Sequence, residues 1–277
     1  MERLFGKKRN VRQLLIGSGG ALCIAVLFCA PIRAQNKSTV TECAGQVLTV
    51  RFQVDCSHVA DPATKALCPV FAQNQACKVF PAYQQITGIH LQDWCSTVQY
   101  IIYDKDKWSM SGAPSGAGGY TVGCRTQYMA DYSLLLKSDI GPYDVHEILH
   151  DYQIALGALP YTHILFGPSM AEATRLIGDS ERYAALMKDD QRDMGRIKDQ
   201  LERGAVAPDT ECLDAELTTE FSLYLKDPNN VRQFYLVLTH DGEMQTRDPQ
   251  SRFDQMYDKV SGGTARPYLL QHGCRFF

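Results

Sequence analysis

Residues 141–152 read GPYDVHEILHDY and contain one H-E-x-x-H motif, at residues 146–150. Proline suits the first turn of a helix, where its missing N–H would be unpaired in any case, and Asp144 complements the positive end of the helix dipole. We therefore predict that a helix begins at Pro142. On that helix His146 and His150 lie one turn apart and project from the same face.

The residue types of the motif are those that a zinc site requires. Zinc binds neutral imidazoles, and an i, i+4 pair brings two of them to one point without help from a loop. Glu147 is turned by about 100° from His146 on the helix, so it can reach a water molecule on the metal without being a ligand. It would accept the proton of that water during attack on a carbonyl. The motif therefore predicts a Zn²⁺ site with His146 and His150 as ligands and Glu147 as the catalytic base.

The segments around the motif predict an α+β chain. Residues 98–103, VQYIIY, are typical of a strand. A Gly- and Ser-rich stretch at 108–119 predicts a loop, and residues 120–124 and 132–136 predict two further strands. Helices are expected mainly within residues 63–86, 169–186, 213–226, 229–239 and 249–260. Strands and the motif helix thus precede a helix-rich C-terminal half.

The N-terminal segment 1–34 has the composition of an export signal. Basic residues gather at its start, an apolar stretch follows, and Ala34 offers a small residue for cleavage. The alternative is an uncleaved membrane anchor, because the apolar stretch is about long enough to span a bilayer. We therefore predict a signal peptide at 1–34 and a secreted or periplasmic protein, with membrane contact only if the segment is retained.

The chain that follows Ala34 is acidic. It keeps 22 of 28 basic and 30 of 31 acidic residues, a net charge of −8 with histidine neutral. This balance, together with the lack of a basic stripe, argues against nucleic acid as a partner.

Eight cysteines remain after Ala34. An even number in an exported chain fits four disulfides, and the sequence leaves all 105 pairings open. Residues 35–95 are predicted to form a Cys-rich, disulfide-stapled N-terminal extension that opens with an exposed lead-in at 35–45. Cys212 and Cys274 are expected to tie the C-terminal helices together or to that extension. The catalytic domain is expected at 96–277.

A zinc site that keeps one position open for water needs a third protein ligand. The third histidine of metzincins is absent, because Gln153 stands where their glycine would be. Glu172, in PSMAEATRLIG, follows His150 by 22 residues. Glu216 and Glu220 are rivals, since other zinc peptidases take this ligand from a more distant helix.

The segments HEILHDYQ and PSMAEATRLIG, with the loop between them, resemble the gluzincin zinc metallopeptidases. The resemblance covers about residues 97–190. It implies a zincin-like fold, with a small mixed sheet over an active-site helix, an edge strand approached by Gly118 and Gly119, and Glu172 as the third zinc ligand.

Two positions depart from this family. Ala173 replaces the glycine that commonly follows the glutamate, and Leu176 stands where some members carry an aspartate that orients a histidine ligand. The orienting group must therefore come from elsewhere, and Asp151 and Asp179 are candidates.

The resulting expectation is an exported zinc metallopeptidase that hydrolyses peptide bonds, with a peptide or protein as substrate. A group that stabilises the oxyanion is also needed, and the candidates are Tyr161, His163, Arg175, Tyr183 and His240. The alternative is an exported, disulfide-stapled binding or scaffold protein with a catalytically silent zincin fold. The sequence leaves the oligomeric state open.

Overall fold

The computed structural model describes residues 36–115, 117–129, 142–155, 165–240 and 249–275. These residues belong to one compact unit, Ala34–Phe277. The division of this unit into an extension at 35–95 and a catalytic domain at 96–277 stays a prediction. The export signal predicted at 1–34 lies outside the described residues.

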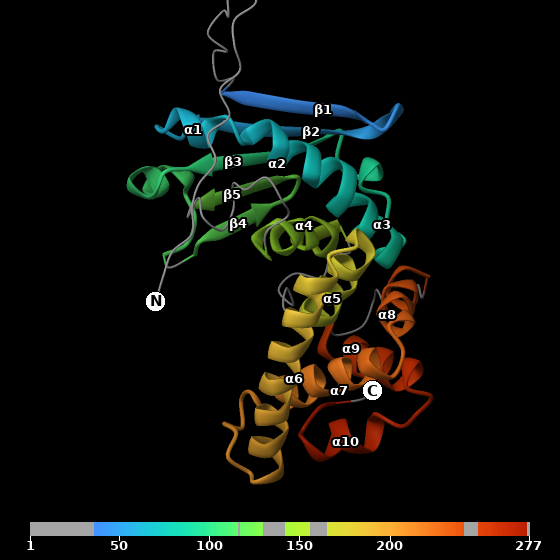
Figure 1. The fold of residues 1–277 in the computed structure, drawn as a ribbon. Helices are drawn as coiled ribbons and strands as arrows, with labels where there is room; N and C mark the ends of the chain where they lie inside the picture. The colour runs from blue at the N-terminus through green and yellow to red at the C-terminus, as the bar shows by residue number, and fades with distance from the viewer. Residues whose placement is uncertain (1–35, 116, 130–141, 156–164, 241–248, 276–277) are drawn as a thin grey trace, which may run out of the picture. The chain divides into compact units, whose positions relative to one another are not determined.

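Five strands form one mixed sheet in the order β1-β2-β3-β5-β4. The two inner pairs, β2–β3 and β3–β5, are parallel, and the two outer pairs are antiparallel. The strands are β1 (Lys37–Cys43), β2 (Gln46–His58), β3 (Thr97–Tyr103), β4 (Gly119–Val122) and β5 (Arg125–Met129). The predicted α+β class with a small mixed sheet is confirmed. The edge strand β4 lies beside the motif helix α4 (Pro142–Ala155), as Figure 1 shows.

Two predictions differ from the observed sheet, and a third concerns residues outside the described ones. Residues 35–45, predicted as an exposed lead-in, contain β1, whose polar composition fits a strand at the sheet edge with mostly solvent-facing side chains. The strand predicted at 120–124 corresponds to β4, which ends at Val122, and the following β5 is not predicted from the sequence. The strand predicted at 132–136 lies outside the described residues.

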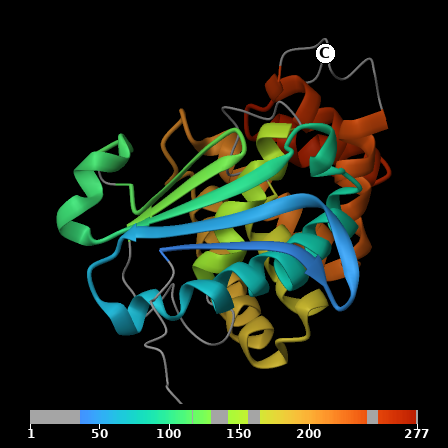
Figure 2. The same ribbon diagram turned by 90° about the horizontal axis from the view of Figure 1, so that it is seen from above.

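The segment between the parallel strands β2 and β3 is helical, because parallel strands need a crossover connection. It contains α1 (Pro62–Lys65), α2 (Cys68–Asn74), a π-helical turn (Gln75–Val79), α3 (Phe80–Thr87) and a 3₁₀ turn (Leu91–Asp93). Seen from above, these helices and α4 lie behind one face of the sheet (Figure 2). The predicted helical character of residues 63–86 is confirmed.

The core between this sheet and the helices is rich in aromatic rings. Phe71 of α2 meets Tyr100 of β3 and Tyr128 of β5 edge to face, at centroid distances of 5.8 and 6.1 Å. Such pairs add stabilisation beyond the burial of apolar area.

Helix α4 is fixed to this core by its apolar side. Ile148, Leu149 and Tyr152 are fully buried. The Tyr152 hydroxyl donates a hydrogen bond of 3.1 Å to the main-chain carbonyl of Phe80 at the start of α3. The helix that carries the motif is therefore held rigidly under the sheet.

The C-terminal half of the described chain is helical, as predicted. Its helices are α5 (Phe166–Ile177), α6 (Ser180–Glu202), α7 (Glu211–Lys226), α8 (Asn229–His240), α9 (Pro249–Val260) and α10 (Arg266–Gln271). The single helix predicted at 169–186 is instead two. Gly178 adopts a left-handed conformation with φ of 87°, which ends α5, and the Asp179 side chain then accepts the N–H of Arg182 to cap α6.

All eight cysteines of this unit form disulfides, and the pairs are Cys43–Cys77, Cys56–Cys68, Cys95–Cys124 and Cys212–Cys274. Three bridges staple the N-terminal half, and the fourth ties α7 to the chain that follows α10. Four bridges fit an oxidising compartment. In the described part of the chain, no helix is both long and apolar enough to cross a bilayer.

Candidate metal and catalytic site

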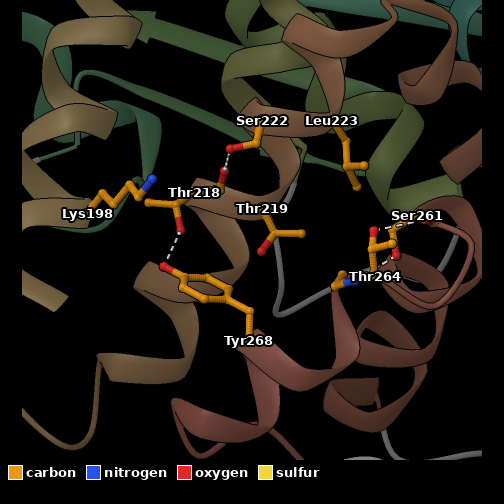
Figure 3. Close-up of a pocket in the computed structure, with 9 residues that line it drawn as sticks. Lys198, Thr218, Thr219, Ser222, Leu223, Ser261, Thr264 and Tyr268 are labelled. Atoms are coloured by element: carbon orange, nitrogen blue, oxygen red, sulfur yellow. Dashed lines mark hydrogen bonds between the residues drawn. The ribbon is translucent and has the colours of Figure 1, made fainter. Parts of the chain in front are cut away.

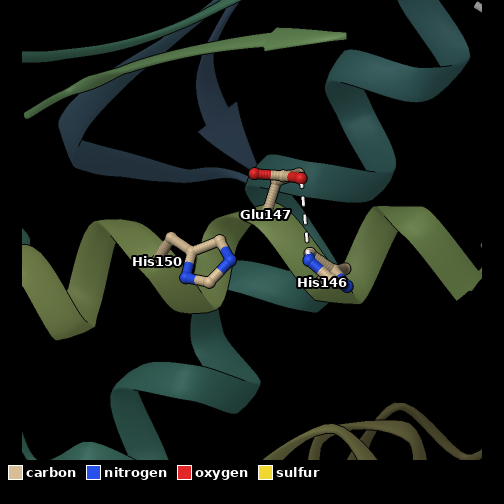
Figure 4. A group of neighbouring side chains, drawn as sticks. All are labelled: His146, Glu147 and His150. Atoms are coloured by element: carbon tan, nitrogen blue, oxygen red, sulfur yellow. Dashed lines mark ion pairs between the residues drawn. The ribbon is translucent and has the colours of Figure 1, made fainter. Parts of the chain in front are cut away.

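The three motif side chains come together on α4 (Figure 4). One ligand atom from each of His146, Glu147 and His150 lies within 4.8 Å of the others. The two imidazoles are partly exposed, whereas Glu147 is only 5% exposed. The helix thus presents two nitrogen ligands towards solvent and a buried carboxylate directly beside them.

Glu147 is held by the edge strand of the sheet. Thr121 of β4 donates a hydrogen bond of 3.0 Å from its hydroxyl to Glu147 Oε2. Gly119 of the same strand approaches so closely that a Cβ atom there would lie 2.8 Å from Glu147 Cδ. Glycine is therefore the residue that lets strand and carboxylate meet at this point.

The surroundings of Glu147 favour its protonated form. Burial raises the pKa of this carboxyl to about 7, and the hydrogen bond from Thr121 opposes the rise in part. A pKa near neutrality is the value at which a carboxyl group transfers protons effectively at physiological pH.

His150 is oriented by a neighbour on its own helix. Its Nδ1 lies 2.9 Å from Oε1 of Gln153, which is buried. A carbonyl oxygen can only accept, so this bond puts the ring hydrogen on Nδ1 and a lone pair on Nε2. A metal-ligating histidine is typically fixed in this way by a partner on its other nitrogen.

Phe166, the first residue of α5, covers the histidine pair. Its ring centroid lies 4.4 Å from that of His146 and 5.7 Å from that of His150. The preceding Leu165 has a left-handed backbone with φ of 59°, which is rare for a residue with a side chain. Its N–H donates a hydrogen bond of 2.8 Å to Glu220 Oε1, so a buried carboxylate of α7 fixes the start of α5.

Glu172 does not join the histidines. It lies on α5 and is 7% exposed, but both of its oxygens accept hydrogen bonds from Arg175, at 2.7 Å from Nε and 2.5 Å from Nη2. The hydroxyl of Tyr224 lies 3.4 Å from the same carboxylate. Among the described residues, Glu147 is the only carboxylate grouped with both histidines. The role of Glu172 as third ligand stays a prediction, and in this arrangement its carboxylate is paired with Arg175.

The two rival glutamates are also elsewhere. Glu216 is buried beside the disulfide between Cys212 and Cys274, with Oε1 3.6 Å from the sulfur of Cys212. Glu220 accepts from Leu165 and from the hydroxyl of Tyr257. Burial raises the pKa of Glu220 to about 8.

The candidates for an orienting acid have other surroundings. Asp179 caps α6. Asp151 is fully buried with neither carboxylate oxygen hydrogen-bonded in the described structure, and burial together with the charge of Glu147 raises its pKa. Within the described part of the chain, neither acid forms a hydrogen bond to His146 or His150. Gln153 is the residue that orients His150.

The candidates for oxyanion stabilisation are only partly described. Tyr161 and His163 lie outside the described residues, as does the side chain of His240. Arg175 is engaged with Glu172, and the Tyr183 hydroxyl accepts a hydrogen bond of 3.3 Å from Tyr224.

Three contacts of the site are not predicted from the sequence, those of Thr121, Gln153 and Phe166. For Gln153 a signal exists, because it lies three residues after His150 and such side chains meet on a helix. Comparison of the chain with protein-family models, curated proteins and solved structures gives no significant match.

Proposed function

We propose that this protein is an exported zinc-dependent peptidase in which Glu147 acts as the general base. The observation that carries the proposal is the buried carboxylate of Glu147, held by Thr121 beside two convergent imidazoles. If the two histidines lay on a half-buried helix by chance, nothing would require a buried carboxyl group beside them. Burial is unfavourable for the charged form of a carboxyl group.

The donor set suits zinc in part. Two neutral imidazoles one helical turn apart match its preference for nitrogen ligands, and Gln153 sets the tautomer of His150. Zinc, when bound, would polarise a carbonyl and lower the pKa of its water. Glu172 would complete the set only if its carboxylate left Arg175.

The residues of this chain would then act on substrate as follows. The side of β4 that does not pair with β5 has no partner strand among the described residues, so an extended peptide could add to it. A peptide bound there would bring a carbonyl towards Glu147, whose carboxylate is held by Thr121 of the same strand. Glu147, with its pKa near 7, accepts the proton of the attacking water and later delivers it to the leaving amine.

The main alternative is a disulfide-stapled binding or scaffold protein with a silent site. The pairing of Glu172 with Arg175 favours it, because in that arrangement the described residues offer the histidines no third ligand besides Glu147, the proposed base. The presence of Glu147, which a silent site does not need, favours the enzyme.

Metal content and hydrolysis separate these functions. Purified, disulfide-bonded protein is dialysed against zinc and then buffer, and its zinc is counted by mass spectrometry, while cleavage of a mixed peptide library is followed in parallel. We expect about one zinc per chain in the wild type, loss of zinc in His150→Ala, and retained zinc in Glu147→Gln with cleavage about 10²- to 10⁴-fold slower.

The outcomes are distinct. Absence of zinc from the wild-type protein contradicts a zinc site. Cleavage that persists in Glu147→Gln or in the presence of o-phenanthroline contradicts the mechanism. Stoichiometric zinc without any cleavage by the wild type supports the scaffold.

A further inference from the structure

A second candidate binding site lies among the C-terminal helices. A cavity of about 250 Å³ is lined by α6, α7, α10 and the turn that precedes α10 (Figure 3). It shares no residue with the histidine cluster. Its volume is just below the roughly 300 to 1,000 Å³ of pockets for drug-sized ligands, so it suits a molecule of about the size of one sugar ring.

The cavity is unusually rich in hydroxyl groups, and their hydrogens are already used. Thr219 of α7 donates to the carbonyl of Ala215 at 2.8 Å, and Ser222 donates to the carbonyl of Thr218 at 2.7 Å. Thr218, Ser261 and Thr264 likewise donate to main-chain carbonyls. A hydroxyl has one hydrogen and two lone pairs. Ser261 already accepts the N–H of Ala265 with one of them, so each of the five groups keeps at least one lone pair for a ligand.

Tyr268 of α10 adds a sixth acceptor. Its hydroxyl lies 3.2 Å from Oγ1 of Thr218. When Thr218 gives its own hydrogen to the carbonyl of Ala215, the hydrogen between the two hydroxyls comes from Tyr268. Figure 3 shows this pair across the gap between α7 and α10.

The charge of the cavity favours a neutral ligand over a cation. Among the described residues that line it there is no carboxylate, and the one charged side chain is Lys198 of α6. The Lys198 ammonium is at the exposed rim, 4.0 Å from Glu202, and would repel a second cation. A neutral ligand with several O–H donors satisfies the hydroxyl oxygens, and its own oxygens can accept from Lys198.

The walls of the cavity are joined covalently. The disulfide between Cys212, in the first turn of α7, and Cys274, just after α10, links the two helices that carry most of the hydroxyls. Leu223 and Ala265, both nearly buried, supply apolar surface for C–H groups. A preformed wall lowers the cost of ordering on binding.

We propose that this cavity binds a neutral polyhydroxylated molecule, a single sugar unit, whose hydroxyls donate to the serine, threonine and tyrosine oxygens. The site is independent of the proposed zinc chemistry, so its test does not require the peptidase to be active.

Ligand binding is tested by saturation-transfer NMR on the full chain with methyl glycosides of glucose, galactose and mannose. Methyl phosphate and methylammonium are the anionic and cationic probes. Thr219→Val removes one acceptor at nearly constant shape, and Ser222→Phe fills the mouth from an exposed position. Thr210→Val is the matched control, because its hydroxyl also donates to a main-chain carbonyl but lies outside the cavity.

We expect saturation transfer to at least one glycoside, with a Kd that rises about three- to tenfold in Thr219→Val, as loss of one hydrogen bond predicts. Binding should be lost in Ser222→Phe and unchanged in Thr210→Val. The proposal is overturned if no glycoside binds, if Ser222→Phe binds as well as the wild type, or if methyl phosphate or methylammonium occupies the cavity in place of the glycosides. Ser222→Phe decides the matter even if Thr219→Val fails to fold.

Discussion

The close approach of Gly119 to Glu147 allows the proposed base to be displaced without changing it. In Gly119→Ala the new Cβ would overlap Glu147 Oε1 and lie 2.8 Å from Cδ, whereas ordinary contacts of a Cβ atom begin at 3.4 Å. Gly118→Ala is the matched control, because a Cβ there meets nothing within 4 Å. Gly118 precedes β4 and Gly119 is its first residue, so the two variants differ in the contact with Glu147.

The magnitude follows from the overlap. The carboxyl group must retreat until Cδ, at 2.8 Å from the new Cβ, reaches the 3.4 Å at which ordinary contact begins, and Oε1, which lies closer still, must retreat further. Glu147 is nearly buried and is held by Thr121, so this shift also strains or breaks that hydrogen bond. A misplacement of about 1 Å in a catalytic group costs about 10²-fold in rate. Overpacking should lower the free energy of unfolding by about 1–3 kcal/mol.

The assay compares cleavage of the peptide library by the two variants, with zinc content and urea unfolding measured on the same samples. We expect Gly119→Ala to retain zinc and fold while cleaving about 100-fold more slowly, and Gly118→Ala to match the wild type. Equal rates for the two variants would refute the role of Glu147 as a base held against β4. Loss of zinc in Gly119→Ala alone would show that the strand contact supports the ligands and not the base.

Three further predictions concern the α5–α7 region and its disulfide. Burial raises the pKa of Glu220 from 4.5 to about 8, so the folded protein keeps a proton that the unfolded chain releases. Glu220 should therefore lower the free energy of unfolding by up to about 5 kcal/mol between about pH 4.5 and 8, and urea unfolding of metal-free Glu220→Gln should show a shallower slope, in which the part due to Glu147 remains. The bridge Cys212–Cys274 joins residues that are 62 positions apart, so replacing both cysteines by alanine should lower the free energy of unfolding by roughly 4 kcal/mol in urea titrations. An unchanged unfolding midpoint would show that α7 and α10 need no covalent link. Arg175→Ala should release the carboxylate of Glu172, and zinc titration should show tighter binding if Glu172 then serves as the third ligand; unchanged affinity would exclude that role.

The sequence predicts those parts of the fold whose signal is local. The helix from Pro142 follows from its first turn and its apolar stripe, and β3 follows from its run of β-branched and aromatic residues. The outer strand β1 has a single buried side chain, so no apolar periodicity marks it. Its place depends on pairing with β2, which is a tertiary contact.

The site divides in the same way. His146, Glu147 and His150 are linked by helix geometry alone, so their proximity is predicted from spacing. Thr121 belongs to a different element from Glu147, and only the position of β4 at the sheet edge makes that contact. Phe166 begins another helix, α5, so its contact with the histidines depends on how α4 and α5 pack and no spacing in the sequence predicts it.

Glu172 shows how one sequence supports two arrangements. A glutamate 22 residues after the second histidine is a workable zinc ligand, but Arg175 at i+3 is an equally local partner on the same helix. A carboxylate that is 7% exposed needs a positive charge, and either the guanidinium or a metal ion can supply it. A shift from Arg175 to the metal would leave the half-exposed guanidinium in contact with water, which is inexpensive for arginine at a surface. The ion pair with Arg175 therefore does not prevent Glu172 from binding zinc. The free energy gained when Glu172 binds zinc must exceed the free energy lost when the ion pair breaks, and Arg175→Ala removes that loss.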